Sequence, residues 1–453
     1  MLVRIFPQKD TTITNYQRYA VPQTASNLGA SEILEVFKRA GMSGAIGVTA
    51  TSSLAHTLTK FDLTLIQQLT GSGLMPANGV TYRLHMSDAQ HEGGLPTSYD
   101  IEVQATSQDW DEGKGRDNDD LSDKGFANWE RRTQAQYWDL FGASGTFVTS
   151  QHFDEGHEDL DVDVTDQVNS WLASGSNYGF LVKVSSSLEA DGNDYYRKMF
   201  HARNTHFPDR RPYIEARWDD HLQDDRNNFF WGTSGTLYLY NVVRGQLTNI
   251  TGDPTQLGVK ISDLSGTVKF VTGSATGLTG IYSASFAVPT GSYSGSLFSD
   301  AWFNLAAPGQ TYMTGAFGIG DNFARQDLSP TQYFVSVPDL RNSYEGEEDV
   351  RLDLYVRPRD YDPAQVLTGS LSSLGTVVTK AYYRIINDRT EDVVVPFSTG
   401  ALEYTRLSYD RKGNFFRFRP GSLSPGQVYR ITFLFDVDGQ RQFIDQGFKF
   451  KVV

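Results

Sequence analysis

The sequence contains no cysteine among its 453 residues, so neither disulfide bonds nor thiolate metal ligands contribute to this protein. Long apolar runs are also missing, and no window approaches the length of a membrane-spanning helix. The first residues, Met1–Phe6, are followed directly by Pro7, Lys9 and Asp10. This pattern leaves no apolar leader, and it predicts a chain that folds in a host cytoplasm.

Basic charge is scarce as well. The 40 Lys and Arg residues are outnumbered by 54 Asp and Glu residues, which gives a net charge of −14. Without a basic stripe, the chain has little with which to displace counterions from a phosphate backbone. We therefore expect neither nucleic acid nor a membrane among its partners.

Strand-forming residues dominate what is present. Aromatic residues make up 13% of the chain and glycine accounts for 42 residues, a composition that favours strands and turns over helices. The length predicts roughly three domains. We expect an all-β protein with a β-sandwich at 1–220, an immunoglobulin-like sandwich at 229–325, and an immunoglobulin-like or fibronectin-like sandwich at 331–453.

Alternating apolar residues predict the individual strands, because a sheet with one buried face needs an apolar residue at every second position. In the first block the segments are 2–6, 32–38, 57–63, 80–86 and 99–105. In the second block they are 236–240, 258–261, 267–271, 281–288, 301–305 and 311–317. In the third block they are 332–337, 350–356, 381–386, 393–397, 415–418, 428–435 and 446–453, with a hairpin turn at Asp438-Gly439.

A polar excursion from Ser107 to Trp138 interrupts the strands of the first block. So long a loop in a compact domain is usually functional or part of an interface. Two interpretations remain open for its three tryptophans, which either pin the loop to the sandwich or stack on sugar rings. The aromatic residues concerned in the second interpretation are Trp110, Trp129, Trp138, Tyr195 and Tyr196.

One short helix is expected, from Val164 to Ala173. Its apolar residues fall on one face at helical spacing. Asp163 stands just before this run, where its carboxylate can accept from a free helix amide, which predicts that it is the N-cap.

Five motifs of the first block resemble a known family. In order, they are Lys60-Phe61-Asp62-Leu63; Trp110-Asp111-Glu112-Gly113 followed by Gly125 and Trp129; Asp163-Val164-Thr165-Asp166-Gln167-Val168 leading to Trp171; Asn177-Tyr178-Gly179-Phe180; and Arg211-Pro212-Tyr213. Their order and approximate spacing are similar to those of DNRLRE-type domains. The resemblance implies a jelly-roll-like β-sandwich, similar to carbohydrate-binding modules, of a kind found in adhesins, wall-associated proteins and phage virion proteins. Where the family often has a Ser-Arg-Glu-like segment, this chain has Phe200-His201-Ala202-Arg203-Asn204, so no ligand role is carried over to that segment.

Two polar segments separate the three blocks. Asp219–Asn228 contains four aspartates and an arginine with almost no apolar residue, which predicts a solvated linker. Ala324–Pro330 is the second predicted linker.

Acidic residues supply the candidate metal ligands. Asp159, Asp161 and Asp163 alternate, so their carboxylates share one face of a strand, where Ca²⁺ would relieve their repulsion. The alternative is that Asp163 caps the helix while Asp159 and Asp161 face water. The stretch His152–Glu158 sets two histidines beside three carboxylates, which indicates either a metal site or a solvated loop. The acidic loops 117–120 and 189–194 lack a complete calcium-loop pattern and are expected to be turns.

Catalytic patterns are absent from the sequence. It has no cysteine nucleophile, no Gly-x-Ser-x-Gly elbow and no phosphate-binding loop. We therefore expect a non-enzymatic protein with no cofactor other than the candidate Ca²⁺.

The resemblance and the modular all-β organisation lead to two functional hypotheses. The first is a structural protein of a phage virion, located at the head, neck or tail, present in multiple symmetric copies, and in contact with capsid, neck or tail proteins. The second is a glycan-binding adhesin module that contacts host polysaccharide. We expect contacts through the long loop of the first block or through the terminal block.

Overall fold

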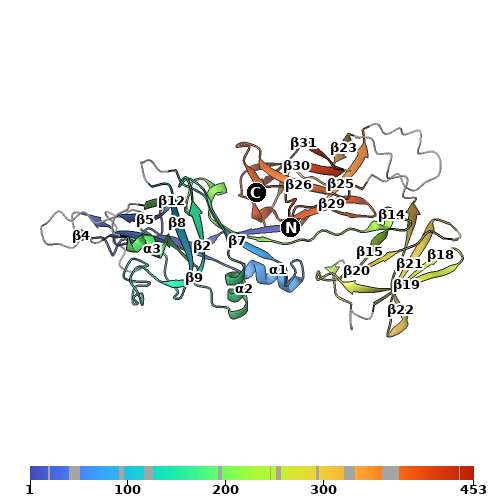
Figure 1. The fold of residues 1–453 in the computed structure, drawn as a ribbon, viewed down its shortest axis with the longest axis horizontal. Helices are drawn as coiled ribbons and strands as arrows, with labels where there is room; N and C mark the ends of the chain where they lie inside the picture. The colour runs from blue at the N-terminus through green and yellow to red at the C-terminus, as the bar shows by residue number, and fades with distance from the viewer. Residues whose placement is uncertain are drawn as a thin grey trace. The chain divides into compact units, whose positions relative to one another are not determined.

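The computed structural model describes residues 1–18, 21–39, 52–90, 96–116, 126–191, 196–244, 246–250, 257–291, 295–320, 332–359, 377–437 and 439–453. Strands predominate throughout these residues, and short helices connect them (Figure 1). The all-β prediction is therefore confirmed. The predicted linker Ala324–Pro330 lies outside the described residues.

The first β-sandwich consists of two sheets. The smaller sheet has the order β1 (Leu2–Ile5), β13 (Tyr213–Arg217), β7 (Thr81–Met86), β10 (Leu160–Asp163). The larger sheet has the order β12 (Tyr196–His201), β5 (Ile33–Arg39), β6 (Ser53–Phe61), β11 (Phe180–Val184), β8 (Tyr99–Thr106), β9 (Gly145–Phe153), and β2 (Pro7–Thr14) also pairs with β6. A two-stranded ribbon, β3 (Gln17–Arg18) and β4 (Val21–Pro22), and the helices α1 (Thr64–Ser72), α3 (Ser186–Ala190) and η1 (Pro208–Arg210) complete this part of the chain.

Helix α2 (Thr165–Ser174) is the short helix that the sequence predicts. Asp163 Oδ1 accepts from the backbone N–H of Thr165 at 2.9 Å, as predicted, although the N-cap position itself belongs to Val164. The buried side chains of the helix include Trp171, whose ring lies 4.7 Å from that of Phe180. The helix ends at Gly175, where a φ of 72° is readily adopted only by a residue without a Cβ.

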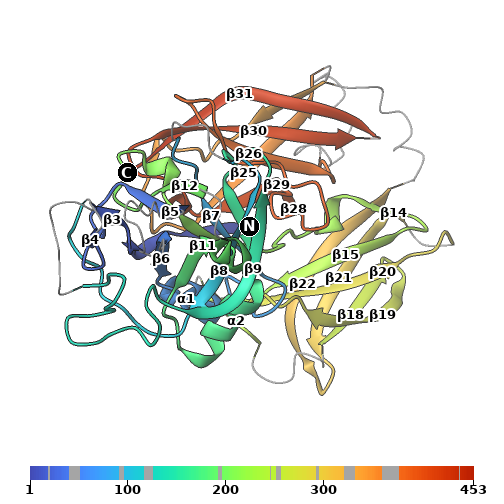
Figure 2. The same ribbon diagram turned by 60° about the vertical axis from the view of Figure 1, so that its left-hand side comes forward.

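The second β-sandwich is one continuous sheet that folds over itself. Its order is β14 (Phe229–Phe230), β22 (Ala307–Gly320), β21 (Leu297–Asn304), β18 (Leu257–Asp263), β19 (Gly266–Ala275), β20 (Ile281–Ala287), β15 (Ser234–Tyr240) (Figure 2). Strand β19 pairs with β18 along most of its length and with β20 at its end, so it passes from one layer to the other. Two short strands, β16 (Val242–Val243) and β17 (Gln246–Leu247), form a hairpin beside it.

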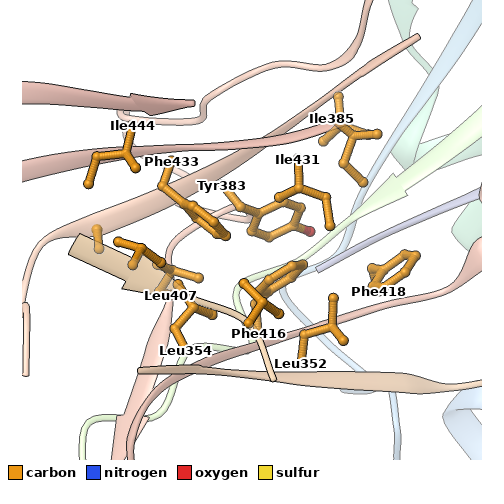
Figure 3. Packing of buried hydrophobic residues seen from close by; sticks show 14 of the residues in the cluster. Leu352, Leu354, Tyr383, Ile385, Leu407, Phe416, Phe418, Ile431, Phe433 and Ile444 are labelled. Atoms are coloured by element: carbon orange, nitrogen blue, oxygen red, sulfur yellow. The ribbon is translucent and has the colours of Figure 1, made fainter. Parts of the chain in front are cut away.

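The third β-sandwich has two separate sheets. One has the order β23 (Tyr333–Ser336), β25 (Val350–Pro358), β29 (Gly413–Phe418), β28 (Ser408–Asp410). The other has the order β24 (Ser343–Tyr344), β31 (Gln440–Val452), β30 (Val428–Val437), β26 (Ala381–Asn387), β27 (Val393–Val395), and the turn η7 (Pro420–Ser422) precedes β30. Aromatic and aliphatic side chains from both sheets interlock in the core, where the rings of Tyr383 and Phe416 stack at 4.4 Å (Figure 3).

Segment 219–228 corrects one prediction. Leu222, Asp224 and Arg226 are buried, so the segment is not a solvated linker. Its main chain follows β28, because Tyr409 donates its N–H to Leu222 O at 2.8 Å and Asp224 donates its N–H to Tyr409 O at 3.0 Å. The turn η2 (Asp225–Asn227) then directs Arg226 Nη2 to Asp300 Oδ2 at 2.7 Å. We call residues 222–227 the clasp, since they bind the second sandwich and the third.

The described chain divides into two compact units. One contains residues 3–67 and 80–217, which make up most of the first sandwich. The other contains residues 1–2, 68–79 and 218–453, and therefore both later sandwiches. Of the helices that the structure describes, none is long and apolar enough to cross a bilayer.

Candidate interaction surface

The loop between β8 and β9, described over 107–116 and 126–144, is anchored by its three tryptophans. Trp110, Trp129 and Trp138 are buried in one apolar cluster. Trp110 Nε1 donates to Tyr178 O at 3.0 Å, and Trp138 Nε1 donates to Asn128 O at 2.8 Å. Because these rings are covered by protein, the structure favours the interpretation in which they pin the loop to the sandwich over the one in which they stack on sugar rings. Tyr196 is buried as well, whereas Tyr195 lies outside the described residues.

Close backbone packing fixes the start of the loop. Asn27 Oδ1 accepts from the N–H of Gly29 at 3.0 Å and from the N–H of Gly115 at 3.2 Å. Asn27 Nδ2 in turn donates to Ala127 O at 2.7 Å. A Cβ added to Gly113 would lie 1.8 Å from Asn27 Oδ1, so only glycine fits there. One buried amide therefore joins three segments of the first sandwich.

An ion-paired group lies next to this packing. Arg203 donates through Nε to Glu112 Oε1 at 2.8 Å and through Nη2 to Glu112 Oε2 at 2.5 Å. Asp10 is buried beside them and accepts from the backbone N–H of Arg203 at 2.7 Å. Burial raises the pKa of Asp10 to about 7, although the backbone hydrogen bond from Arg203 opposes the rise. These ion pairs join segment 110–113, which resembles a DNRLRE-type motif, to segment 200–204, which departs from that family's pattern. Both segments therefore stabilise the fold.

The outer side of the same loop is apolar. Tyr137, Leu140 and Phe141 have 51%, 65% and 63% of their surface exposed, and Phe147 on the edge strand β9 has 58% exposed. We call these four residues the loop surface. Four large apolar side chains within eleven residues, held on a fixed base, are typical of a protein-binding surface.

The alternating acids lie in and just before β10, as predicted, but they bind protein groups. Asp159 Oδ1 accepts from the backbone N–H of Asp88 at 2.7 Å, and its Oδ2 lies 3.6 Å from His85 Nε2. Asp161 Oδ1 accepts from Arg83 Nε at 2.8 Å. Nowhere in the described ranges do three His, Asp or Glu residues gather in a manner that could hold a metal ion. Protein groups therefore bind both carboxylates, Arg83 at Asp161 and a backbone N–H at Asp159, and a Ca²⁺ site at Asp159 and Asp161 stays a prediction.

The stretch His152–Glu158 folds around a lysine. Lys198 has no exposed surface, and its Nζ donates to Asp88 Oδ1 at 2.6 Å, to Gly156 O at 3.0 Å and to Glu158 O at 2.8 Å. Burial lowers the pKa of Lys198, while its hydrogen bond to Asp88 opposes that shift. The carbonyl groups of this loop are therefore organised by an internal ammonium group.

His152 itself belongs to a hydrogen-bonded series. Its Nδ1 lies 2.9 Å from Asp100 Oδ1, and its Nε2 lies 3.2 Å from Ser98 Oγ. This is the order of a serine, histidine and aspartate triad. The side chains of His152 and Asp100 are each 50% exposed, however, whereas the aspartate of such a triad is buried, where it holds the histidine in position. We interpret the series as a surface hydrogen-bond network.

Glu189, which the sequence places in an acidic loop, forms a buried polar group. Its Oε1 lies 2.8 Å from His56 Nε2, and its Oε2 accepts from Lys183 Nζ at 2.7 Å. His56 Nδ1 lies 2.6 Å from Gly142 O, which ties this group to the end of the long loop. The remaining acids of that stretch and the loop 117–120 fall in part or entirely outside the described residues.

The loop surface was not identified as such from the sequence. The signal that could have found it is the pair Leu140-Phe141 next to Gly142, because two large apolar residues in a turn with no alternating pattern have no core to enter. The long loop itself was predicted as an interface element, and of the two interpretations of its tryptophans the structure favours the one in which they pin the loop to the sandwich.

No family model matches this sequence, and no curated protein matches it. Among solved structures, titin immunoglobulin tandem domains A164-A165 match 50% of this chain and 91% of their own at 8% identity, with a TM-score of 0.14. Trypsin-activated alpha-2-macroglobulin from Escherichia coli matches 88% of this chain at 8% identity with a TM-score of 0.17, and a Salmonella alpha-2-macroglobulin reacted with methylamine matches 100% with the same identity and score. This chain spans 23% and 28% of those two macroglobulins.

Scores this low carry no argument. The sheets described above define the class of protein by themselves, which is an all-β chain built of β-sandwiches.

Proposed function

We propose that this chain is a non-enzymatic structural component of a phage virion, at the head, neck or tail, that attaches to another virion protein through the loop surface. The observation that carries this proposal is the contrast between the two sides of the long loop. Its inner side is fixed by three buried tryptophans, while its outer side exposes Tyr137, Leu140 and Phe141 beside Phe147. A rigid apolar surface of this kind binds without the entropy cost of ordering a loop.

Two further features support a structural role. The motifs that resemble DNRLRE-type domains act within the fold, as the ion pair of Glu112 with Arg203 illustrates. The polar clusters of the first sandwich are also internally paired, including Lys198 with Asp88 and Glu189 with His56. Side chains whose hydrogen-bonding groups are already used are better suited to stabilising a scaffold than to binding a substrate.

The experiment is complementation of a phage that lacks the gene for this chain, with the Leu140→Asp/Phe141→Asp double variant. Placing two carboxylates on the loop surface should remove the chain from purified particles while leaving the soluble protein folded. The matched control is Phe207→Asp, which changes a side chain that is 62% exposed elsewhere on the same sandwich and should be incorporated normally.

Mass spectrometry of the purified particles supplies the readout. Absence of the unmodified chain from the particles would refute the virion assignment, and normal incorporation of the double variant would refute the loop surface as the attachment point. The competing hypothesis, a glycan-binding module, has lost its tryptophan platform. It predicts binding of the full chain to a glycan array, together with absence from particles.

A further inference from the structure

The second sandwich is almost uncharged, although the chain as a whole is strongly acidic. Residues 229–320 contain no glutamate and no histidine, whereas 21% of the whole chain is charged. Their charged residues are three basic ones, Arg244, Lys260 and Lys269, and three acidic ones, Asp253, Asp263 and Asp300. This part of the chain is therefore neutral, and the net charge of −14 belongs to the rest of the protein.

The few charges of this sandwich are mostly placed away from one face. Asp300 is buried, where it pairs with Arg226. Asp263 lies at the β18–β19 turn, where its Oδ1 accepts from the backbone N–H groups of Ser265 at 2.8 Å and Gly266 at 2.9 Å. Lys269 Nζ donates to Ala287 O at 3.1 Å. Lys260 remains as the charged residue in the middle of β18.

Strand register places the outward side chains of β19, β18, β21 and β22 on one sheet face. Lys260 lies opposite Phe270 on one side and opposite Ala301 on the other. We call this the neutral face, which consists of Gly258, Lys260, Ser262, Phe270, Thr272, Leu297, Ser299, Ala301, Phe303, Thr314 and Ala316. Apart from Lys260, its side chains are apolar or small and uncharged.

Large apolar groups stand on this face. Phe270 is 64% exposed and Leu297 is 55% exposed. The rings of Phe270 and Phe303 meet edge to face at 6.3 Å. Phe303 lies across Gly258, where an added Cβ would come within 2.7 Å of the ring. The glycine therefore makes room for the ring of Phe303 on this face.

We propose that the neutral face packs against the same face of a second copy of this chain around a two-fold axis. Nearly all of the net charge of −14 lies in residues 1–228, so two copies repel one another mainly through their first sandwiches and approach best where acidic residues are absent. A two-fold contact brings identical patches together, and this patch is apolar enough to complement itself. The aliphatic stem of Lys260 covers apolar surface while its ammonium group reaches the rim. This inference holds wherever the copies are displayed and does not depend on the virion assignment.

The test is the mass of the full chain in solution, measured by light scattering and sedimentation over a concentration series. We expect a concentration-dependent dimer whose dissociation constant rises at least about tenfold in Phe270→Glu, because each copy would lose an apolar ring from the contact and would have to desolvate a carboxylate in its place. The control variant Phe443→Glu, at a site that is 67% exposed in the third sandwich, should dimerise like the unmodified chain. Circular dichroism of each variant checks that the fold is retained.

Salt dependence gives an independent readout. Raising NaCl from about 0.05 M to about 0.5 M screens the repulsion between the acidic surfaces and should strengthen this dimer, whereas a contact made by ion pairs would weaken. A chain that stays monomeric at about 100 µM would overturn the proposal. So would a dimer that Phe270→Glu leaves intact, or one that only Leu140→Asp disrupts, since the latter assigns the contact to the loop surface.

Discussion

Lys198 illustrates how this protein places charge in its interior. Its ammonium group has no exposed surface and three acceptors, of which Asp88 lies 110 residues away in the sequence. Glu215 is similar, since it is buried between Arg4 at 2.6 Å and Arg217 at 2.5 Å. Buried charges of this kind are tolerated only when partners surround them. Each such group therefore fixes the relative position of distant strands.

Replacement of Lys198 by methionine should destabilise the first sandwich by about 3–5 kcal/mol, because the Asp88 carboxylate and two carbonyl groups would remain buried without a donor. Chemical unfolding followed by tryptophan fluorescence measures the loss. Arg83→Met removes the more exposed ion pair with Asp161 and should cost less than about 1 kcal/mol. Equal losses in the two variants would contradict the assignment.

The raised pKa of Asp10 predicts how the free energy of unfolding changes with pH. Burial raises its pKa from 3.8 to about 7 in the folded protein. Its contribution to folding is therefore complete below about pH 4 and is lost as the pH rises through 7. Asp10→Asn should flatten the decrease in unfolding free energy between about pH 5 and pH 8, since an amide does not ionise there and can still accept from Arg203. Parallel curves for the variant and the unmodified chain would show that Asp10 does not titrate in this range.

Short-range residue roles could be predicted from the sequence, and long-range ones could not. The bond from Thr165 to Asp163 spans two residues, and the pattern around it was sufficient to expect it. Asp161 accepts from Arg83 of β7, and Asp159 accepts from the backbone N–H of Asp88 just after β7, each more than seventy residues away in the sequence. Counting acids along the chain therefore indicated a repulsive cluster, because the donors that bind these carboxylates are distant in the sequence.

At the scale of elements, too, contacts between distant parts of the chain limit what the sequence can predict, and the long loop is an example. Apolar alternation predicts strands such as β7, β8 and β31 well, because it reports which face is buried. Strand β9 was missed because its exposed edge position leaves no alternation to detect. A tryptophan in a loop carries no such pattern, so whether it faced the core or solvent was open until the fold was known.

Trp129 gives a direct test of the loop assignment. Trp129→Ala should lower the unfolding free energy of the first sandwich by about 3–5 kcal/mol by leaving a cavity next to His56. Tyr137→Ala, on the outer side of the loop, should cost less than about 1 kcal/mol. A sugar-stacking role would instead give a stable Trp129→Ala variant that loses glycan binding.

The clasp is the element that the sequence misrepresented most. The five charged residues of segment 219–228 indicated solvent exposure. Within the clasp, however, Arg226 reaches Asp300 in the second sandwich, and Asp225 accepts from Tyr409 Oη and from the N–H of Thr236, each at 2.7 Å. One short segment thus bonds to both later sandwiches. Burial also raises the pKa of Asp224 to about 6, although Arg226 opposes the rise.

Arg226→Ala should therefore cost about 3–5 kcal/mol, because Asp224 and Asp300 would be left buried without their cation. We also expect the second and third sandwiches to unfold in two separate steps in scanning calorimetry, where the unmodified chain unfolds them together. Arg341→Ala, which breaks a more exposed pair with Glu348, is the control and should leave the transition nearly unchanged. A single transition in Arg226→Ala would show that the clasp does not couple the two sandwiches.

At the scale of the whole molecule, charge is distributed unevenly, because residues 1–228 hold 33 acidic and 20 basic residues, whereas acidic and basic residues are equal in number in each of the two later sandwiches. The sequence pI is near 5.0, so repulsion between copies should fade as the pH falls toward that value. We expect light scattering of the unmodified chain to show tighter dimers at about pH 5.5 than at about pH 8. Phe270→Glu should remain more dissociated at both values, and an association that weakens on acidification would contradict this account.

One pairing occurs in both later sandwiches. Strand β14 lies parallel to the end of β22, through Phe229 with Ile319 and Phe230 with Gly320, and β24 lies parallel to the end of β31 in the same manner. In the second sandwich this pairing bonds the first strand to the last, and in the third it bonds the second strand to the last. A force that pulls the chain from either side of a sandwich would load these bonds in shear, so that they must break together, whereas an antiparallel hairpin unzips one bond at a time. Both later sandwiches are therefore built to resist mechanical tension along the chain.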